Sequence, residues 1–249
     1  MGRSITVEIC VGDLRSALEA GEGGADRVEL CDRLEVGGTT PSAGTIAEAC
    51  RRLTIPVHVL IRNRAGDFAP SEPELAAMHH DVETAKRLGA SGVVLGILKN
   101  DGTIDRDATA RLIELARPMS VTFHKAFDQT RDLDEALETL VELGVDRVLT
   151  SGGRPSAEAG ADALVRLVAR AGDRIGVLVA GRLTVENLGG IVRRTRAREI
   201  HLGSAAMGLN ESPAAFAPPD GSTLDWLGVR AERVRRIIEV AADSESTLC

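Results

Sequence analysis

The sequence predicts an α/β fold, namely a (β/α)8 TIM barrel that forms a single domain over residues 1–249. Short runs rich in β-branched residues alternate with helical patterns along the whole chain, as parallel strands joined by helices do. The length of 249 residues suits such a barrel, which typically takes about 250. Aromatic residues make up only 2% of the chain, so aliphatic side chains must fill the core, which is typical of buried parallel strands.

Eight strands are expected, each followed by a helical segment, at about 31 residues per unit. A doubly wound open sheet is the main alternative. That fold has a glycine-rich phosphate turn after its first strand, and Cys10-Val11-Gly12-Asp13 is not such a turn. The barrel is therefore preferred. The expected strands are Ile5–Ile9, Arg27–Leu30, Pro56–Ile61, Gly92–Ile97, Ser120–His124, Arg147–Thr150, Ile175–Ala180 and Glu199–Leu202.

Helix start and stop signals support this order. Ser71 with Glu74, and Asp132 with Glu135, have the spacing of a capping box at a helix start. Both segments end in Leu-Gly, where glycine permits the left-handed turn that closes a helix. A last helix is expected near Arg230–Ala241.

The longest irregular stretch is Gly203–Asp225, which contains three prolines. It is open to three interpretations: a lid, an oligomer contact or a plain surface loop.

Charge and composition exclude several classes of partner. The net charge of −7 and the pI near 5.4 argue against a nucleic-acid partner, which requires a positive surface. No stretch is apolar for long enough to cross a membrane, and the start lacks the pattern of a signal peptide. Four cysteines in a chain of this length are not a disulfide framework. We therefore expect a cytoplasmic protein with reduced thiols.

Two neighbouring strands end in the same pattern, Glu8-Ile9-Cys10 and Glu29-Leu30-Cys31. Successive residues of a strand alternate between its faces, so each cysteine shares a face with the glutamate two residues before it. If the glutamates face the barrel mouth, two carboxylates and two thiols converge on one small region. Cys50, on a helix, is interpreted as a small buried hydrophobe, and Cys249 as a terminal residue without a role.

Other ionisable side chains also follow the strands. Arg62 and Arg64 come after the third strand, and His201 lies near the end of the eighth. Polar groups at the carboxyl ends of barrel strands are typical of an active site. His58 is interpreted instead as a core histidine. The candidate catalytic residues are Glu8, Glu29, Arg62, His124, Lys125, Asp128 and His201.

These motifs together resemble the copper homeostasis protein CutC family, over Val7 to about Ser204. The resemblance implies a cytoplasmic TIM-barrel protein associated with copper handling and forming a homo-oligomer, a dimer or a tetramer. It implies no particular reaction. The residues that carry it are Glu8-Ile9-Cys10, Gly24-Ala25-Asp26-Arg27-Val28-Glu29-Leu30-Cys31, Gly37-Gly38-Thr39-Thr40-Pro41-Ser42, Ile55-Pro56-Val57-His58, Arg62-Asn63-Arg64-Ala65-Gly66-Asp67-Phe68, Val121-Thr122-Phe123-His124-Lys125-Ala126-Phe127-Asp128 and Arg147-Val148-Leu149-Thr150-Ser151-Gly152.

Two hypotheses for function follow. In the first, Cys10 and Cys31 bind copper as Cu(I), because thiolates are soft ligands that select this ion and adjacent strands lie about 4.8 Å apart. Cys50 and Cys249 are then dispensable.

In the second, the chain is an enzyme that acts on a small polar or phosphorylated metabolite. Glu8 and Glu29 are its acid–base candidates, with His124 or Lys125 as partner. Arg62 and Arg64 would hold an anionic group through forked hydrogen bonds. A further variant places a hard divalent ion between Glu29, His124 and His201.

Overall fold

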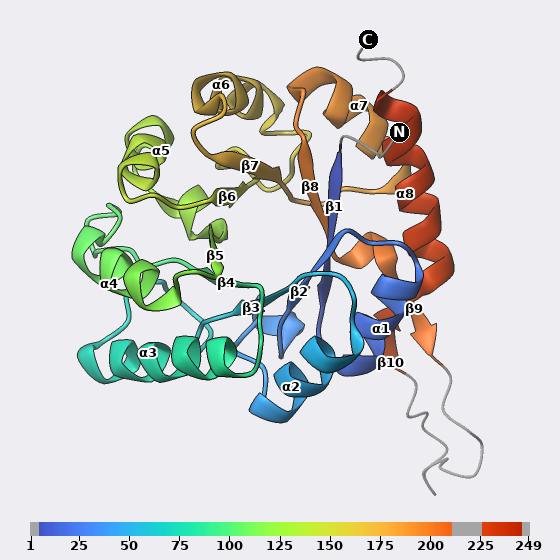
Figure 1. Ribbon diagram of the computed structural model, residues 1–249. Coiled ribbons are helices and arrows are strands. Elements are labelled where there is room, and N and C mark those ends of the chain that lie inside the picture. Colours follow the sequence, from blue (N-terminus) through green and yellow to red (C-terminus); the bar gives the residue numbers. More distant parts are fainter. Residues whose placement is uncertain (1–4, 211–225, 246–249) are drawn as a thin grey trace, which may run out of the picture.

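A closed barrel of eight parallel strands forms the centre of the computed structural model, which describes residues 5–210 and 226–245, and helices surround it (Figure 1). The strands pair in sequence order, and β1 closes the barrel against β8. The predicted fold class is confirmed. The barrel strands are β1 Thr6–Val11, β2 Arg27–Leu30, β3 Val57–Leu60, β4 Gly92–Leu95, β5 Ser120–Phe123, β6 Arg147–Thr150, β7 Gly176–Val179 and β8 Glu199–Leu202.

The helices begin and end close to the predicted signals. Ser71 and Glu74 form the expected capping box. Asp132 also caps its helix, by accepting from the amides of Asp134 and Glu135, whereas the Glu135 carboxylate pairs with Arg131. The helices are α1 Leu14–Glu22, α2 Ala43–Arg52, α3 Glu72–Arg87, α4 Arg106–Ala116, α5 Leu133–Glu142, α6 Ala161–Ala171, α7 Val185–Thr195 and α8 Ala231–Glu245, with short 3-10 turns η1 Leu34–Val36, η2 Lys125–Gln129 and η3 Ser204–Ala206.

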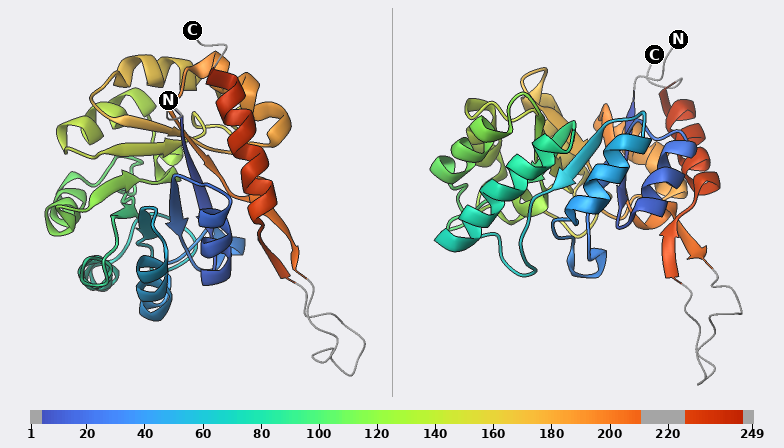
Figure 2. Two further views of the ribbon diagram at one scale, coloured as in Figure 1. Left: turned by 45° about the vertical axis from the view of Figure 1, so that its right-hand side comes forward. Right: turned by 60° about the horizontal axis from the view of Figure 1, so that its bottom comes forward.

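The stretch predicted to be irregular contains a strand. β9 (Met207–Asn210) pairs antiparallel with β10 (Trp226–Val229), and this pair projects from the barrel at the start of α8 (Figure 2). The amide of Val229 donates to the Ser16 hydroxyl, which attaches the pair to α1. Met-Gly-Leu-Asn has no β-branched residue, so local propensity gives no sign of the strand. Residues 211–225 of the predicted loop, and Cys249, lie outside the described residues.

Apolar side chains fill the space between the strands and the surrounding helices, whereas charged side chains occupy part of the barrel interior. On β1, Val7, Ile9 and Val11 are fully buried among apolar side chains, and Glu8 points to the other face. Barrels of this kind are usually filled by layers of branched aliphatic residues.

Four charged residues, Glu8, Arg27, Arg147 and Glu199, form what we call the lumen network. Arg27 Nε pairs with Glu8, and Arg27 Nη2 lies 2.9 Å from Glu199 Oε2. Arg147 Nε lies 3.2 Å from the same Glu199 oxygen. The pair Arg27–Glu199 joins β2 to β8, and Arg147–Glu199 joins β6 to β8, although neither pair of strands is adjacent. The side chains therefore meet inside the barrel.

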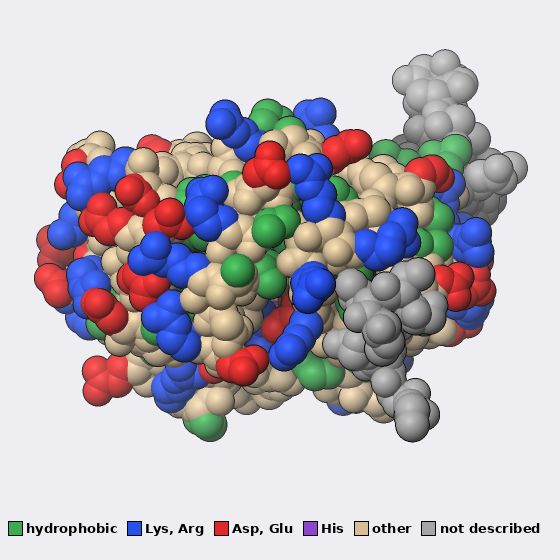
Figure 3. Space-filling model, turned by 90° about the horizontal axis from the view of Figure 1, so that it is seen from above, with side chains coloured by type: hydrophobic (Ala, Val, Ile, Leu, Met, Phe, Trp, Pro, Cys, Tyr) green, Lys and Arg blue, Asp and Glu red, His purple; other side chains and the backbone are tan. Residues whose placement is uncertain are grey.

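The outer surface carries charges of both signs. On the side shown in Figure 3, Lys and Arg side chains are interspersed with Asp and Glu. Some of these charges join neighbouring helices, as Glu138 on α5 does by pairing with Arg170 and Arg174. Such exposed pairs stabilise a fold only slightly. None of the helices in the described part of the chain has the length and apolar character that a bilayer requires.

We expect Glu8→Gln to lower the free energy of unfolding by roughly 3 kcal/mol, because it removes one partner of a buried charge pair. Glu138→Gln is the matched control, since Glu138 also joins two cations but lies on the surface, and it should leave the urea midpoint almost unchanged. Urea unfolding followed by circular dichroism measures both. Equal midpoints for the two variants would show that the lumen network does not stabilise the barrel.

Candidate functional site

A cavity of about 600 Å³, which we call the mouth cavity, opens at the carboxyl ends of the strands. Residues from β1, β2 and β8 and from the segments that follow β3 and β5 line it. Five of the predicted catalytic candidates belong to the lining, and so do both predicted metal ligands. These residues are Glu29, Arg62, His124, Lys125 and His201, with Cys10 and Cys31.

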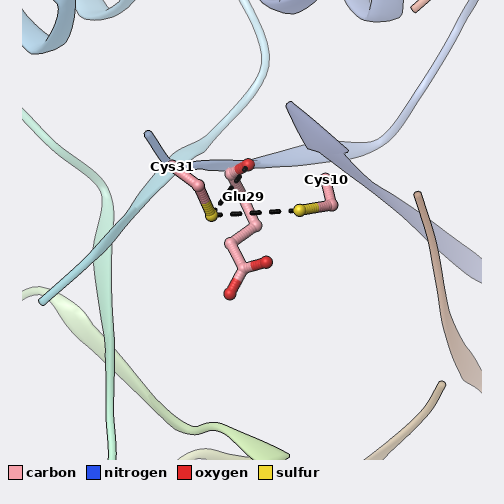
Figure 4. Close-up of side chains that lie close together, drawn as sticks. All are labelled: Cys10, Glu29 and Cys31. Carbon is pink, nitrogen blue, oxygen red and sulfur yellow. Dashed lines mark hydrogen bonds between the residues drawn. The ribbon is translucent and has the colours of Figure 1, made fainter. Parts of the chain in front are cut away.

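Cys10, Glu29 and Cys31 lie together at one wall of this cavity (Figure 4). The two sulfur atoms point toward each other and are 3.8 Å apart. One ligand atom from each of the three residues lies within 4.8 Å of the others. The register of β1 and β2 accounts for this, because Cys10 pairs directly with Glu29 and Cys31 follows two residues later. Among the described residues this is the one group of three potential ligands, so the predicted set Glu29, His124 and His201 does not form.

The pKa values of the two thiols are shifted in opposite directions. The hydrogen bond from Cys31, joined by one from His201, outweighs burial and lowers the pKa of Cys10 to about 5. The same hydrogen bond, with burial, raises the pKa of Cys31 well above its ordinary value. These shifts favour the thiolate at Cys10 and the thiol at Cys31, with Cys31 as the donor of the hydrogen bond between them.

Glu8 lies beneath the mouth cavity and not in its lining, because it is fully buried in the lumen network. Burial alone would raise its pKa, but Arg27 and then His201 outweigh this and hold the pKa well below its ordinary value. One Glu8 oxygen lies 2.7 Å from His201 Nδ1. Glu8 therefore positions His201 and does not reach a ligand in the cavity itself.

His201 connects this buried carboxylate to the thiols. Burial alone would lower its pKa, but hydrogen bonds with Cys10 and Glu8 outweigh burial and raise the pKa well above its ordinary value. Its Nε2 lies 3.8 Å from Glu29. Burial, and then the charge of Cys10, raise the pKa of Glu29 well above its ordinary value. The site thus brings together a histidine shifted toward its charged form, a cysteine shifted toward its thiolate and a carboxyl shifted toward its protonated form.

His124 is a neutral imidazole on another wall of the cavity. Burial, with the nearby Arg62, lowers its pKa to about 3. Its Nδ1 accepts from the Ala126 amide at 3.2 Å, and its ring lies 4.9 Å from that of Phe68. His58 is buried in β3 as expected, and burial lowers its pKa to about 3 as well.

The arginines predicted to bind an anion have other partners. Arg62 donates to the carbonyls of Val36, Gly38 and Gly66. Arg64 pairs with Glu74 and Asp67. Arg62 lines the cavity, but its guanidinium holds loops in place, and Arg64 is neutralised. The forked anion contact expected of these two residues therefore stays a prediction.

Asp128 also differs from its predicted role. It lies outside the mouth cavity, and its carboxylate accepts from the Thr150 hydroxyl, from the amide and hydroxyl of Ser151, and from the Gly153 amide. These bonds occupy both oxygens and fix the loop after β6. Sequence reasoning missed Arg27, although it lies two residues before Glu29 and shares its face, a signal that strand alternation provides.

Comparisons with known proteins agree with these motifs. A model of the CutC family matches residues 5–206. The chain is 48% identical over 195 residues to a CutC family protein of Chromobacterium violaceum, which covers 78% of this chain and 79% of that protein. It is 46% identical over 195 residues to the human copper homeostasis protein cutC homolog, covering 78% of this chain and 71% of that one.

Solved structures extend the likeness to the fold. A structure named as a copper homeostasis protein CutC from Streptococcus agalactiae has a TM-score of 0.76 at 35% identity, covering 80% of this chain and 98% of that chain. Phosphoribosyl anthranilate isomerase from Thermococcus kodakaraensis has a TM-score of 0.57 at 19% identity, covering 95% and 98%. The second likeness shows the barrel fold alone.

We expect iodoacetamide to alkylate Cys10 at a rate that rises with pH through about 5 and is constant near neutrality, because only the thiolate reacts. Cys50 is the internal control, since burial raises its pKa and its reaction should begin only in alkaline solution. Peptide mass spectrometry separates the two sites. In His201→Gln the rise for Cys10 should move to higher pH. A wild-type Cys10 that reacts only in alkaline solution would contradict the assigned thiolate.

Proposed function

The chain belongs to the CutC family, and from this premise we propose that it binds Cu(I) between Cys10 and Cys31 in copper homeostasis. The observation that supports this most is the thiolate–thiol pair at the wall of an open cavity. Thiolates are soft ligands, and soft ligands select Cu(I) over harder ions.

The spacing of the sulfurs suits a shared ion. A metal–thiolate bond is about 2.3 Å long for zinc, so one ion can bridge sulfurs up to about 4.6 Å apart. The separation of 3.8 Å between Cys10 and Cys31 lies within this span. Only one further proton must leave when an ion binds, because Cys10 is already deprotonated at neutral pH. The imidazolium of His201 stabilises that thiolate.

We extend the proposal to the location of the protein in the cell and to its oligomeric state. The described cysteines, Cys10, Cys31 and Cys50, are free, and the proposed ligands must stay reduced, which favours the cytoplasm. We also propose a homo-oligomer, a dimer or a tetramer. The exposed Leu209 and Leu227 face each other on β9 and β10, and exposed apolar groups of this kind mark contact surfaces. Light scattering measures the subunit number.

Titration of reduced protein with Cu(I) against a competing chelator tests the site. Loss of a residue that only supports a metal ligand costs roughly 10–100-fold in affinity, so loss of a ligand should cost more than about 100-fold. We expect such a loss in Cys10→Ser and in Cys31→Ser. Cys50→Ser is the matched control and should bind as the wild type does. Unchanged affinity in both Cys10→Ser and Cys31→Ser would overturn the proposed site.

An enzyme is the second candidate, because neighbouring groups whose pKa values are shifted in opposite directions are typical of acid–base catalysis. Glu29 would be the general acid. Its pKa is raised, as is that of His201, whereas the pKa of the neighbouring Cys10 is lowered. Metabolite profiling of the purified protein, with bound metal measured in the same sample, separates the two candidates. A metabolite consumed by metal-free protein would favour the enzyme.

A further inference from the structure

A second cavity, of about 310 Å³, adjoins the mouth cavity at the ends of β6, β7 and β8. We call it the β6–β8 pocket. It shares Lys125, Leu149, His201, Gly203 and Ser204 with the lining of the mouth cavity, so one small molecule can occupy both. The proposed Cu(I) site makes no use of this pocket, although three of the predicted catalytic candidates, Lys125, Asp128 and His201, line it.

Three cationic residues, Lys125, Arg154 and Arg182, line the β6–β8 pocket. None of them forms an ion pair within residues 5–210 and 226–245, whereas many other arginines of the chain do. The carboxylate in the lining is that of Asp128, and the loop after β6 already occupies it. In a protein with a net charge of −7, three cations therefore accompany a single carboxylate in this pocket, which makes it locally positive.

The loops around the pocket are fixed in place before any ligand binds. Gly181 has φ +103°, and a Cβ there would lie 2.7 Å from the Cβ of Ser151, so only glycine allows the loops after β6 and β7 to approach. Arg182 has φ +51°, a left-handed conformation that is costly for a residue other than glycine. Strain of this kind collects at functional sites, where the surrounding structure maintains it.

From these observations we propose that the β6–β8 pocket binds the phosphoryl group of a small phosphate monoester. A dianion is the ligand that three unpaired cations match best, because charge-assisted hydrogen bonds to phosphate are strong and arginine binds it through two of them. The rest of the ligand lies in the mouth cavity beside His201. This inference goes beyond Cu(I) binding and does not depend on it, because neither Cys10 nor Cys31 lines the β6–β8 pocket.

Calorimetric titration with inorganic phosphate, and with glycerol 3-phosphate against glycerol, tests the proposal. We expect saturable binding of both phosphates and none of glycerol. Arg154→Gln and Arg182→Gly should each bind phosphate at least about tenfold more weakly, because each removes a charged donor. Arg182→Gly also relieves the left-handed backbone, so its thermal midpoint should not fall.

Arg111→Gln is the matched control, since Arg111 is an exposed arginine on α4 that forms no ion pair with another described residue. It should bind phosphate as the wild type does. Absence of saturable phosphate binding in the wild type, or equal weakening in all three variants, would overturn the proposal. Cu(I) affinity, measured on the same proteins, should be unchanged in Arg182→Gly, so failure of the phosphate site and failure of the copper site are separate results.

Discussion

Arg27 and Glu8 form an ion pair inside a barrel whose interior is, in most proteins of this fold, filled by aliphatic side chains. Glu8 is fully buried, and Arg27 is almost fully buried. A buried charge requires a partner, and Glu199 provides the second one for Arg27 and is in turn shared with Arg147. The lumen network is thus a chain of alternating charges that leads from the floor of the barrel toward its mouth.

The chemistry of the mouth follows from this chain. Arg27 keeps Glu8 ionised, and Cys10 and then Glu8 raise the pKa of His201 and favour its imidazolium form. The imidazolium in turn favours the Cys10 thiolate, whose negative charge helps to keep Glu29 protonated. The protonation states of His201 and Cys10 depend on each other, and Glu8 on one side and Cys31 on the other reinforce them. A metal ion or an anionic ligand at the mouth therefore meets charges that the interior of the barrel has already set.

The succession of strand and helix patterns predicted the fold, and the alternation of faces along each strand predicted that Cys10, Glu29 and Cys31 converge, because side chains on one face of neighbouring parallel strands must meet. Alternation does not reveal which groups a side chain contacts once it is there. Arg62 was expected to be free for a ligand, but its guanidinium binds backbone carbonyls of loops far from it in sequence. The sequence did not predict the hairpin of β9 and β10 for a related reason. The two strands are specified by their pairing with each other and not by the propensity of their own residues.

The protonation state of His201 is the most direct test of this account. Nitrogen-15 NMR distinguishes imidazole from imidazolium, and His201→Gln assigns the signal among the five histidines of the chain. We predict that His201 remains an imidazolium at pH values well above 6.5, while His58 and His124, whose pKa values burial lowers to about 3, remain neutral. A His201 that loses its proton near 6.5, the ordinary value for histidine, would contradict the account, because Cys10 and Glu8 would then not hold its charge.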